Sequence, residues 1–369
     1  KGRTMIKRKY ISVRLLTSGM VIDQSIIDGT GRVLIHRKTT LDDYMINSLR
    51  KMNIGGVYIR EGEESAEEIT YNISPEVMEK IEKVKVPDRA KIELHESVKK
   101  RVAEGIQFLY SNPDSPNFMD ATNNVSSELM RALEENDALA VDVSALKVSD
   151  EYTFKHSVDV ASMGMIIAKN RGLSAREVQQ IGVSGLLHDL GKSKIPNEIL
   201  NKPGRLTDAE FETMKTHPIL GYNMIKDKPD LSTATKFGVL QHHEKMNGNG
   251  YPLKLQGDQI TPFARILSVA DIYDALVTER PYKDAFSPRD AVEMIMAMTG
   301  DLDIHMIQSF LNSVILYPVD SIIKLSTGEF AKIVQNIPGY PTRPTVITLN
   351  LGQIYALASD IKCASIIII

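Results

Sequence analysis

The chain has 369 residues, with 44 Lys plus Arg against 47 Asp plus Glu, and 43% of its residues are hydrophobic. This length predicts two or three domains, and this composition excludes a mostly disordered chain. The net charge of -3 excludes an overall field that would attract DNA. No apolar run is long enough to predict a transmembrane segment. The single cysteine, Cys363, excludes an intramolecular disulfide and a cysteine-based zinc site, and it is typical of a cytoplasmic protein.

Residues 1–62 are expected to form a small α/β accessory domain. Short β-rich runs separated by Asp28-Gly29 and Thr30-Gly31 predict strands and turns, and apolar residues at helical spacing predict one helix. The expected elements are strands at 10–15, 19–22 and 32–35 in a meander, a helix at 41–52 and a strand at 57–59.

The rest of the chain is predicted to be largely helical. Residues 63–136 are charge-rich and helical in pattern, and they form either a connector or the first helices of the next domain. Residues 137–315 predict an all-α domain. Residues 316–369 predict a short β-rich extension with strands at 322–325, 330–334 and 346–349. Its final isoleucines, 366–369, are expected to be a tail or a packed strand.

Histidines gather in the most apolar predicted helices. Five of the eight lie between residues 156 and 243. His156 shares a helical face with Val160 and Met163, and Asp271 follows Phe263 at the same kind of spacing, so both are expected to face the core. An ionised carboxylate in a core needs a cationic or metal partner. Each histidine taken alone is more typical of a satisfied core residue.

Two adjacent pairs, His188-Asp189 and His242-His243, favour a metal site. His217 precedes Pro218 and is expected at the start of a helix. Five histidines and two aspartates exceed the three or four protein ligands of one tetrahedral zinc, and therefore predict a two-metal site. Such centres, roughly 3.5 to 4 Å apart with a bridging hydroxide, suit attack on a phosphodiester. Imidazole and carboxylate ligands favour iron or manganese, with zinc, nickel and magnesium as alternatives.

Two runs of the sequence form a specific pattern. They are His188-Asp189-Leu190-Gly191-Lys192, and His242-His243-Glu244 followed by Gly250-Tyr251-Pro252. Together they resemble the HD-GYP family of bacterial phosphodiesterases. The first run alone indicates the wider HD phosphohydrolase superfamily. The second run narrows the resemblance to the HD-GYP family within it, and this resemblance covers about residues 150–310. Residues 1–62 also resemble a small domain found ahead of HD-GYP units.

The resemblance implies hydrolysis of cyclic di-GMP to the linear dinucleotide or GMP, although some members prefer the mixed cyclic GMP-AMP. The metal ligands that it implies are His156, His188, Asp189, His217, His242, His243 and Asp271, with Asp189 as the bridge. It assigns catalysis to His188, Asp189 and Lys192, with Lys192 protonating the leaving oxygen. The implied substrate contacts are Lys192, Gly250, Tyr251, Pro252, Arg280 and Lys283. We expect the Tyr251 ring to stack on a guanine.

Two positions depart from the family pattern. Members with a third metal have a glutamate four residues before the first ligand histidine, whereas this chain has Tyr152 there, with Glu151 one residue out of place. This supports two metals. Asn247 stands where many members have Asp, with little expected consequence because Asn-Gly still favours a turn.

Other readings stay open at the level of sequence. The catalytic fold could serve as a cyclic dinucleotide receptor or interaction scaffold without turnover. It could also be an HD hydrolase of mononucleotides or alarmones, which the Gly250-Tyr251-Pro252 run disfavours. The N-terminal domain is expected to regulate or dimerise the catalytic domain. A homodimer and a protein partner of this domain are open alternatives.

Overall fold

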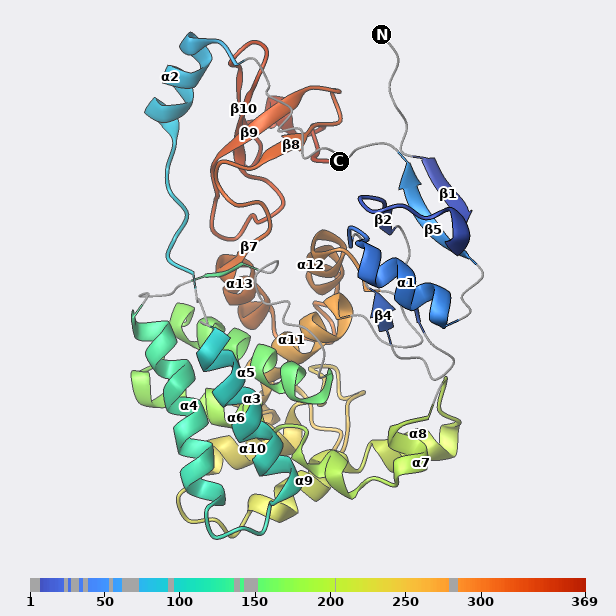
Figure 1. Ribbon diagram of the computed structural model, residues 1–369. Coiled ribbons are helices and arrows are strands. Elements are labelled where there is room, and N and C mark those ends of the chain that lie inside the picture. Colours follow the sequence, from blue (N-terminus) through green and yellow to red (C-terminus); the bar gives the residue numbers. More distant parts are fainter. Residues whose placement is uncertain are drawn as a thin grey trace. The chain divides into compact units, whose positions relative to one another are not determined.

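The computed structural model describes residues 7–22, 26–27, 33–35, 39–52, 56–61, 73–91, 96–135, 140–142, 152–202, 204–278 and 285–369. The chain divides into two compact units, residues 1–73 and 74–369. Figure 1 shows the elements in chain order. Small sheets lie near the two ends of the sequence and helices between them, which confirms the predicted fold class.

The first unit contains a three-stranded antiparallel sheet. Its strands β1 (Lys7–Ser12), β5 (Gly56–Glu61) and β2 (Val21–Ile22) follow the order β1-β5-β2. The last strand lies between the first two, so the predicted meander is wrong. A separate antiparallel pair consists of β3 (Ile26–Ile27) and β4 (Val33–Ile35).

The strand predicted to reach residue 15 ends at Ser12. Residues Val13–Leu15 form the 3-10 helix η1 instead. Val13 and Leu16 are both buried in the core of this unit, and residues three apart lie on one side of a 3-10 turn. Helix α1 (Asp43–Lys51) begins after Asp42, whose carboxylate accepts a hydrogen bond from Met45 N at 2.7 Å.

The second unit is dominated by helices, as predicted. They are α2 (Pro75–Val84), α3 (Glu96–Ser111), α4 (Phe118–Glu135), α5 (Tyr152–Asn170), α6 (Ala175–Leu187), η2 (Leu190–Lys194), α7 (Asn197–Leu200), α8 (Asp208–Met214), α9 (His217–Ile225), α10 (Thr233–Gln241), η3 (Gly257–Gln259), α11 (Pro262–Val277), α12 (Pro288–Ala297) and α13 (Ile304–Ser313). A capping box of Thr207 and Glu210 starts α8.

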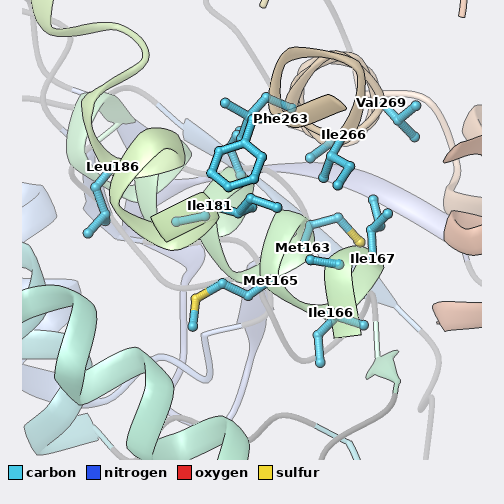
Figure 2. Packing of buried hydrophobic residues seen from close by; sticks show 14 of the residues in the cluster. Met163, Met165, Ile166, Ile167, Ile181, Leu186, Phe263, Ile266 and Val269 are labelled. Atoms are coloured by element: carbon cyan, nitrogen blue, oxygen red, sulfur yellow. The ribbon is translucent and has the colours of Figure 1, made fainter. Parts of the chain in front are cut away.

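One apolar core joins α3 and α4 to the helices of the histidine-rich region. Figure 2 shows Met163 and Ile167 of α5 packed with Ile181 of α6 and Ile266 of α11. Residues of α3 and α4 thus pack together with those of α5, α6 and α11. The predicted domain boundaries themselves stay predictions.

A four-stranded antiparallel sheet follows the helices. Its order is β11-β10-β9-β8, with β8 (Ile322–Lys324), β9 (Phe330–Gln335), β10 (Thr345–Thr348) and β11 (Ile354–Ala356). The three predicted strands are confirmed. Strand β11 was not predicted.

Two further features complete this unit. Ile366 and Ile368 pack in the core of the C-terminal sheet, after the 3-10 helix η4 (Ile361–Cys363), so the terminal isoleucines are packed. Strand β6 (Val141–Asp142) pairs in parallel with β7 (Val314–Ile315) and joins the two ends of the helical region. Among the described residues, no helix has both the length and the apolar character to cross a bilayer.

Candidate metal centre

The seven predicted ligands meet in the helical region, in two groups. One group consists of Asp189, His217, His242 and His243, and the other of His156, His188 and Asp271. Within each group the potential ligand atoms lie within 4.8 Å of one another. The residues come from α5, from the ends of α6 and α10, from the start of α9 and from α11.

The turn after Asp189 packs closely against the start of α9. A side chain at Gly191 would overlap the carbonyl oxygen of His217 and lie 2.5 Å from Gly221 N. Only glycine allows this approach. It places Asp189 Oδ1 3.3 Å from His217 Nε2, although the two residues belong to different helical segments.

Asp189 faces both groups. Its Oδ2 lies 3.4 Å from His188 Nε2 and 3.6 Å from His156 Nε2, whereas its Oδ1 faces His217. The side chain is buried, and the described residues supply no hydrogen-bond donor to Oδ1. An orphaned buried carboxylate oxygen is costly unless a cation pairs with it. This geometry is that of a ligand that two metal ions could share.

Backbone carbonyls fix the orientation of three imidazoles. In His188, His217 and His242, Nδ1 donates to the carbonyl oxygen three residues earlier, at 2.7, 2.9 and 2.8 Å respectively. In the neutral tautomer this leaves Nε2 as an acceptor directed at the centre. The accepting carbonyls belong to Gly185, Met214 and Val239.

These orientations make two acceptor nitrogens face each other. His217 Nε2 and His242 Nε2 are 3.3 Å apart. Two acceptor nitrogens at this separation could both bind one divalent ion. Lone pairs repel each other at that distance without a cation between them. The residues of this group therefore fit a divalent ion.

Asp274 orients His156 and was missed by the sequence analysis. Its Oδ2 lies 2.6 Å from His156 Nδ1, and both residues are largely buried. Burial alone lowers the pKa of His156, but hydrogen bonds to Asp271 and Asp274 outweigh it and raise the pKa to about 10. The available signal was the spacing of Asp271 and Asp274, since residues three apart share a helical face.

In the other group, burial and neighbouring charges shift pKa values toward the protonation states that bind a cation. Burial and the neighbouring imidazoles lower the pKa of His242 well below its usual value. Burial also lowers the pKa of His243 to about 3, so both rings are neutral at pH 7. Burial would raise the pKa of Asp189, but His188 and Lys192 hold it well below its usual range. His242 and His243 therefore offer neutral nitrogens and Asp189 an ionised oxygen, which are the forms that bind metals.

Two predicted substrate contacts lie at the edge of the centre. Lys192 Nζ is 2.5 Å from Asp189 Oδ2, and 30% of its side chain is exposed. The Tyr251 ring lies 4.7 Å from the His243 ring, between centroids. Arg280 and Lys283 fall outside the described residues, as does Glu151, and the side chain of Tyr152 is not described.

The loop that carries Tyr251 is held close to the ligands. Gly250 is buried, and a side chain there would overlap Lys245 N and lie 2.5 Å from Glu244 Cα. Tyr251 N donates to the carbonyl oxygen of His243 at 3.2 Å. The carboxylate of Glu244, which the sequence analysis did not single out, accepts hydrogen bonds from Leu253 N at 2.6 Å and from Leu255 N at 3.0 Å. Pro252 follows Tyr251 through a cis peptide bond.

Sequence comparison relates this chain to the HD domain family and to cyclic dinucleotide phosphodiesterases. Residues 141–305 match the HD domain family. The chain is 35% identical to a cyclic di-GMP phosphodiesterase of Pseudomonas aeruginosa, over 60% of this chain and 53% of the relative. It is 36% identical to a cyclic di-GMP phosphodiesterase response regulator of Xanthomonas campestris, over 46% of this chain and 45% of the relative.

A third relative has a different named substrate. A 3'3'-cGAMP-specific phosphodiesterase of Vibrio cholerae is 37% identical over 42% of this chain and 30% of the relative. The chain thus spans about half the length, or less, of these curated relatives. His188-Asp189 and Gly250-Tyr251-Pro252 meet at one centre within residues 141–305, which match the HD domain family, and this confirms the resemblance to the HD-GYP family.

Proposed function

We propose that this protein is a metal-dependent phosphodiesterase that hydrolyses a cyclic dinucleotide, with cyclic di-GMP as the principal substrate. The observation that carries the proposal is the meeting of five imidazoles and two carboxylates around Asp189, beside the loop with Tyr251. The names of the relatives support this class of substrate. Mixed cyclic GMP-AMP is the second candidate, because one relative is named as specific for it.

The two groups would hold one divalent ion each, with Asp189 shared between them. Iron or manganese is the proposed metal, because imidazole and carboxylate ligands suit both, and zinc, nickel and magnesium are alternatives. Bound ions of this kind polarise a phosphoryl oxygen and make water nucleophilic at neutral pH. Asp274 and the three helix carbonyls keep the imidazoles oriented for them.

The protein itself would bind and orient the phosphodiester. Lys192 is partly exposed beside Asp189, so its ammonium group can meet a phosphate oxygen and can donate a proton to the leaving oxygen. Tyr251 presents an aromatic ring next to His243 on which a base can stack. Phosphate contacts by Arg280 and Lys283 remain part of the proposal on the strength of the resemblance.

The test is chromatographic turnover of cyclic di-GMP and 3'3'-cGAMP by protein purified with and without oxygen, with elemental analysis of bound metal. We expect hydrolysis with about two metals per chain. Asp189→Asn should lose both activity and metal, whereas Asp230→Asn, at an exposed aspartate between α9 and α10, should behave like the wild type.

Other outcomes would favour the alternatives. Two bound metals and tight cyclic dinucleotide binding without hydrolysis would indicate a receptor or scaffold. Faster hydrolysis of mononucleotides would indicate another HD hydrolase. The release of linear dinucleotide or GMP, a homodimer, a partner of the N-terminal domain and a cytoplasmic location remain predictions.

A further inference from the structure

We propose that Asp301 is a positioning residue of the cyclic dinucleotide site, and that it holds the loop of residues 245–252 against the metal centre. This loop carries Gly250, Tyr251 and Pro252. The inference rests on the proposed function, because it assigns Asp301 a role in substrate binding through Tyr251. Asp301 itself lies outside the catalytic and ligand residues, between α12 and α13.

Asp301 binds the loop at three successive residues. Its Oδ2 pairs with Lys245 Nζ at 2.6 Å, and its Oδ1 accepts a hydrogen bond from Asn247 Nδ2 at 2.6 Å. Its backbone carbonyl oxygen accepts a hydrogen bond from Met246 N at 2.8 Å. One residue from a distant part of the sequence therefore fixes the first half of the loop.

The opposite side of the loop is fixed by Glu244, through Leu253 N and Leu255 N. Tyr251 lies between these two attachments. Its position next to His243 thus depends on both a buried carboxylate and a partly exposed one. Glu244 follows the predicted ligand His243 directly, whereas Asp301 is far from the predicted ligands in sequence. Asp301 can therefore be substituted without changing a residue next to a ligand.

Hydrogen bonds also hold the segment that carries Asp301. Asp303, two residues later, accepts a hydrogen bond from Arg265 Nη1 at 3.0 Å and one from His305 N at 2.8 Å, at the start of α13. Arg265 belongs to α11, which also carries Asp271. The loop is therefore connected through Asp301 and Asp303 to a helix that supplies a ligand.

This arrangement requires an amide at position 247. Asn247 donates through Nδ2 to Asp301 and accepts through Oδ1 from Asn249 N at 2.9 Å. A carboxylate at 247 could still accept from Asn249 N, but its second oxygen would face Asp301 Oδ1. Two carboxylate oxygens at hydrogen-bond distance repel each other. The turn preference of Asn-Gly is therefore one reason for an asparagine at position 247, and its hydrogen bond to Asp301 is a second.

An exchange of the two groups tests the contact. Asn247→Asp should place two carboxylates together, and Asp301→Asn should leave either Asn247 or Lys245 facing another donor. In the double variant, the new amide at 301 can donate to the new carboxylate at 247 while its oxygen still accepts from Lys245 Nζ. The original pattern of hydrogen bonds is then restored with donor and acceptor exchanged.

We expect each single variant to raise KM for cyclic di-GMP about tenfold, as the loss of one or two hydrogen bonds would. The value of kcat should change less than KM, and metal content should not change. The double variant should return KM to within about twofold of the wild type, with Asp230→Asn as the control for loss of a surface charge. Additive losses in the double variant, or unchanged KM in both singles, would overturn the proposal.

Hydrogen exchange separates this inference from the proposed function. Amides of residues 246–255 should exchange faster in each single variant and return to the wild-type rate in the double variant. This readout needs no turnover. If the wild type hydrolyses no cyclic dinucleotide but exchange follows this pattern, the function is wrong and the contact stands. If turnover is normal and exchange does not respond, Asp301 does not hold the loop.

Discussion

Removing the carboxylate of Asp274 should weaken one half of the metal centre selectively. Its Oδ2 receives a 2.6 Å hydrogen bond from His156 Nδ1, and both side chains are largely buried. Hydrogen bonds to charged groups contribute about 1.5 to 3 kcal/mol, which corresponds to roughly 10- to 150-fold in a binding constant. We therefore expect Asp274→Ala to lower metal affinity at the group of His156, His188 and Asp271 by about that factor.

The assay is metal content by elemental analysis after dialysis against a series of Mn²⁺ concentrations. The wild type should fill both sites over the series, whereas Asp274→Ala should fill the group around His217 first and the other only at higher concentration. Asp274→Asn keeps an acceptor for Nδ1 without the charge, and should fall between the two. Equal affinity at both sites in Asp274→Ala would refute the reasoning that this carboxylate orients His156.

Four further predictions follow from individual contacts. Tyr251→Ala should raise KM for cyclic di-GMP by roughly 5- to 150-fold, since a stacked base is worth about 1 to 3 kcal/mol, while Tyr251→Phe should keep most of the affinity; equal KM values for both variants would count against stacking. Gly191→Ala should lower the free energy of unfolding by about 1 to 3 kcal/mol in chemical denaturation, because a methyl group would overlap the His217 carbonyl; wild-type stability would contradict this. Removal of metal with a chelator should lower the melting temperature, and Mn²⁺ should restore it, because an ion that binds only the folded state stabilises it; an unchanged melting temperature would argue against a resident ion. Arg265 and the amides of His305 and Met306 hold the pKa of Asp303 below its usual value despite burial. The ionised carboxylate therefore stabilises the folded protein above about pH 4, and this contribution is lost as the pH falls through the folded-state pKa. The free energy of unfolding of Asp303→Asn should depend less steeply on pH in acid than that of the wild type.

The residues of the candidate metal centre could be predicted because chemistry and position agree in them. His156 and Asp271 are polar residues on apolar helical faces, and adjacent pairs such as His188-Asp189 are visible in the sequence itself. The helices that carry them also have clear limits, such as Pro262 at the start of α11. A regular helix with a strong apolar stripe fixes which residues face the core, and therefore which polar residues meet there.

The supporting contacts could not be predicted in the same way. Glu244 belongs to the run after His242 but has no predicted role, and Asp301 looks like an ordinary charged residue; each acts through bonds to a loop of irregular backbone. The strand order of the first unit could not be predicted either, because β5 lies between β1 and β2. Strand order and loop attachment depend on contacts between distant segments, which local periodicity does not report.

The ends of three helices orient imidazoles of the candidate metal centre. The last four carbonyls of a helix have no partner within it. Gly185, Met214 and Val239 all lie in the last turn of their helices, α6, α8 and α10. A histidine three residues after each of them donates Nδ1–H to that carbonyl. The hydrogen bond that satisfies the helix end thereby fixes the tautomer that leaves Nε2 free for a metal, so helix termination and metal binding place the same requirement on these three positions.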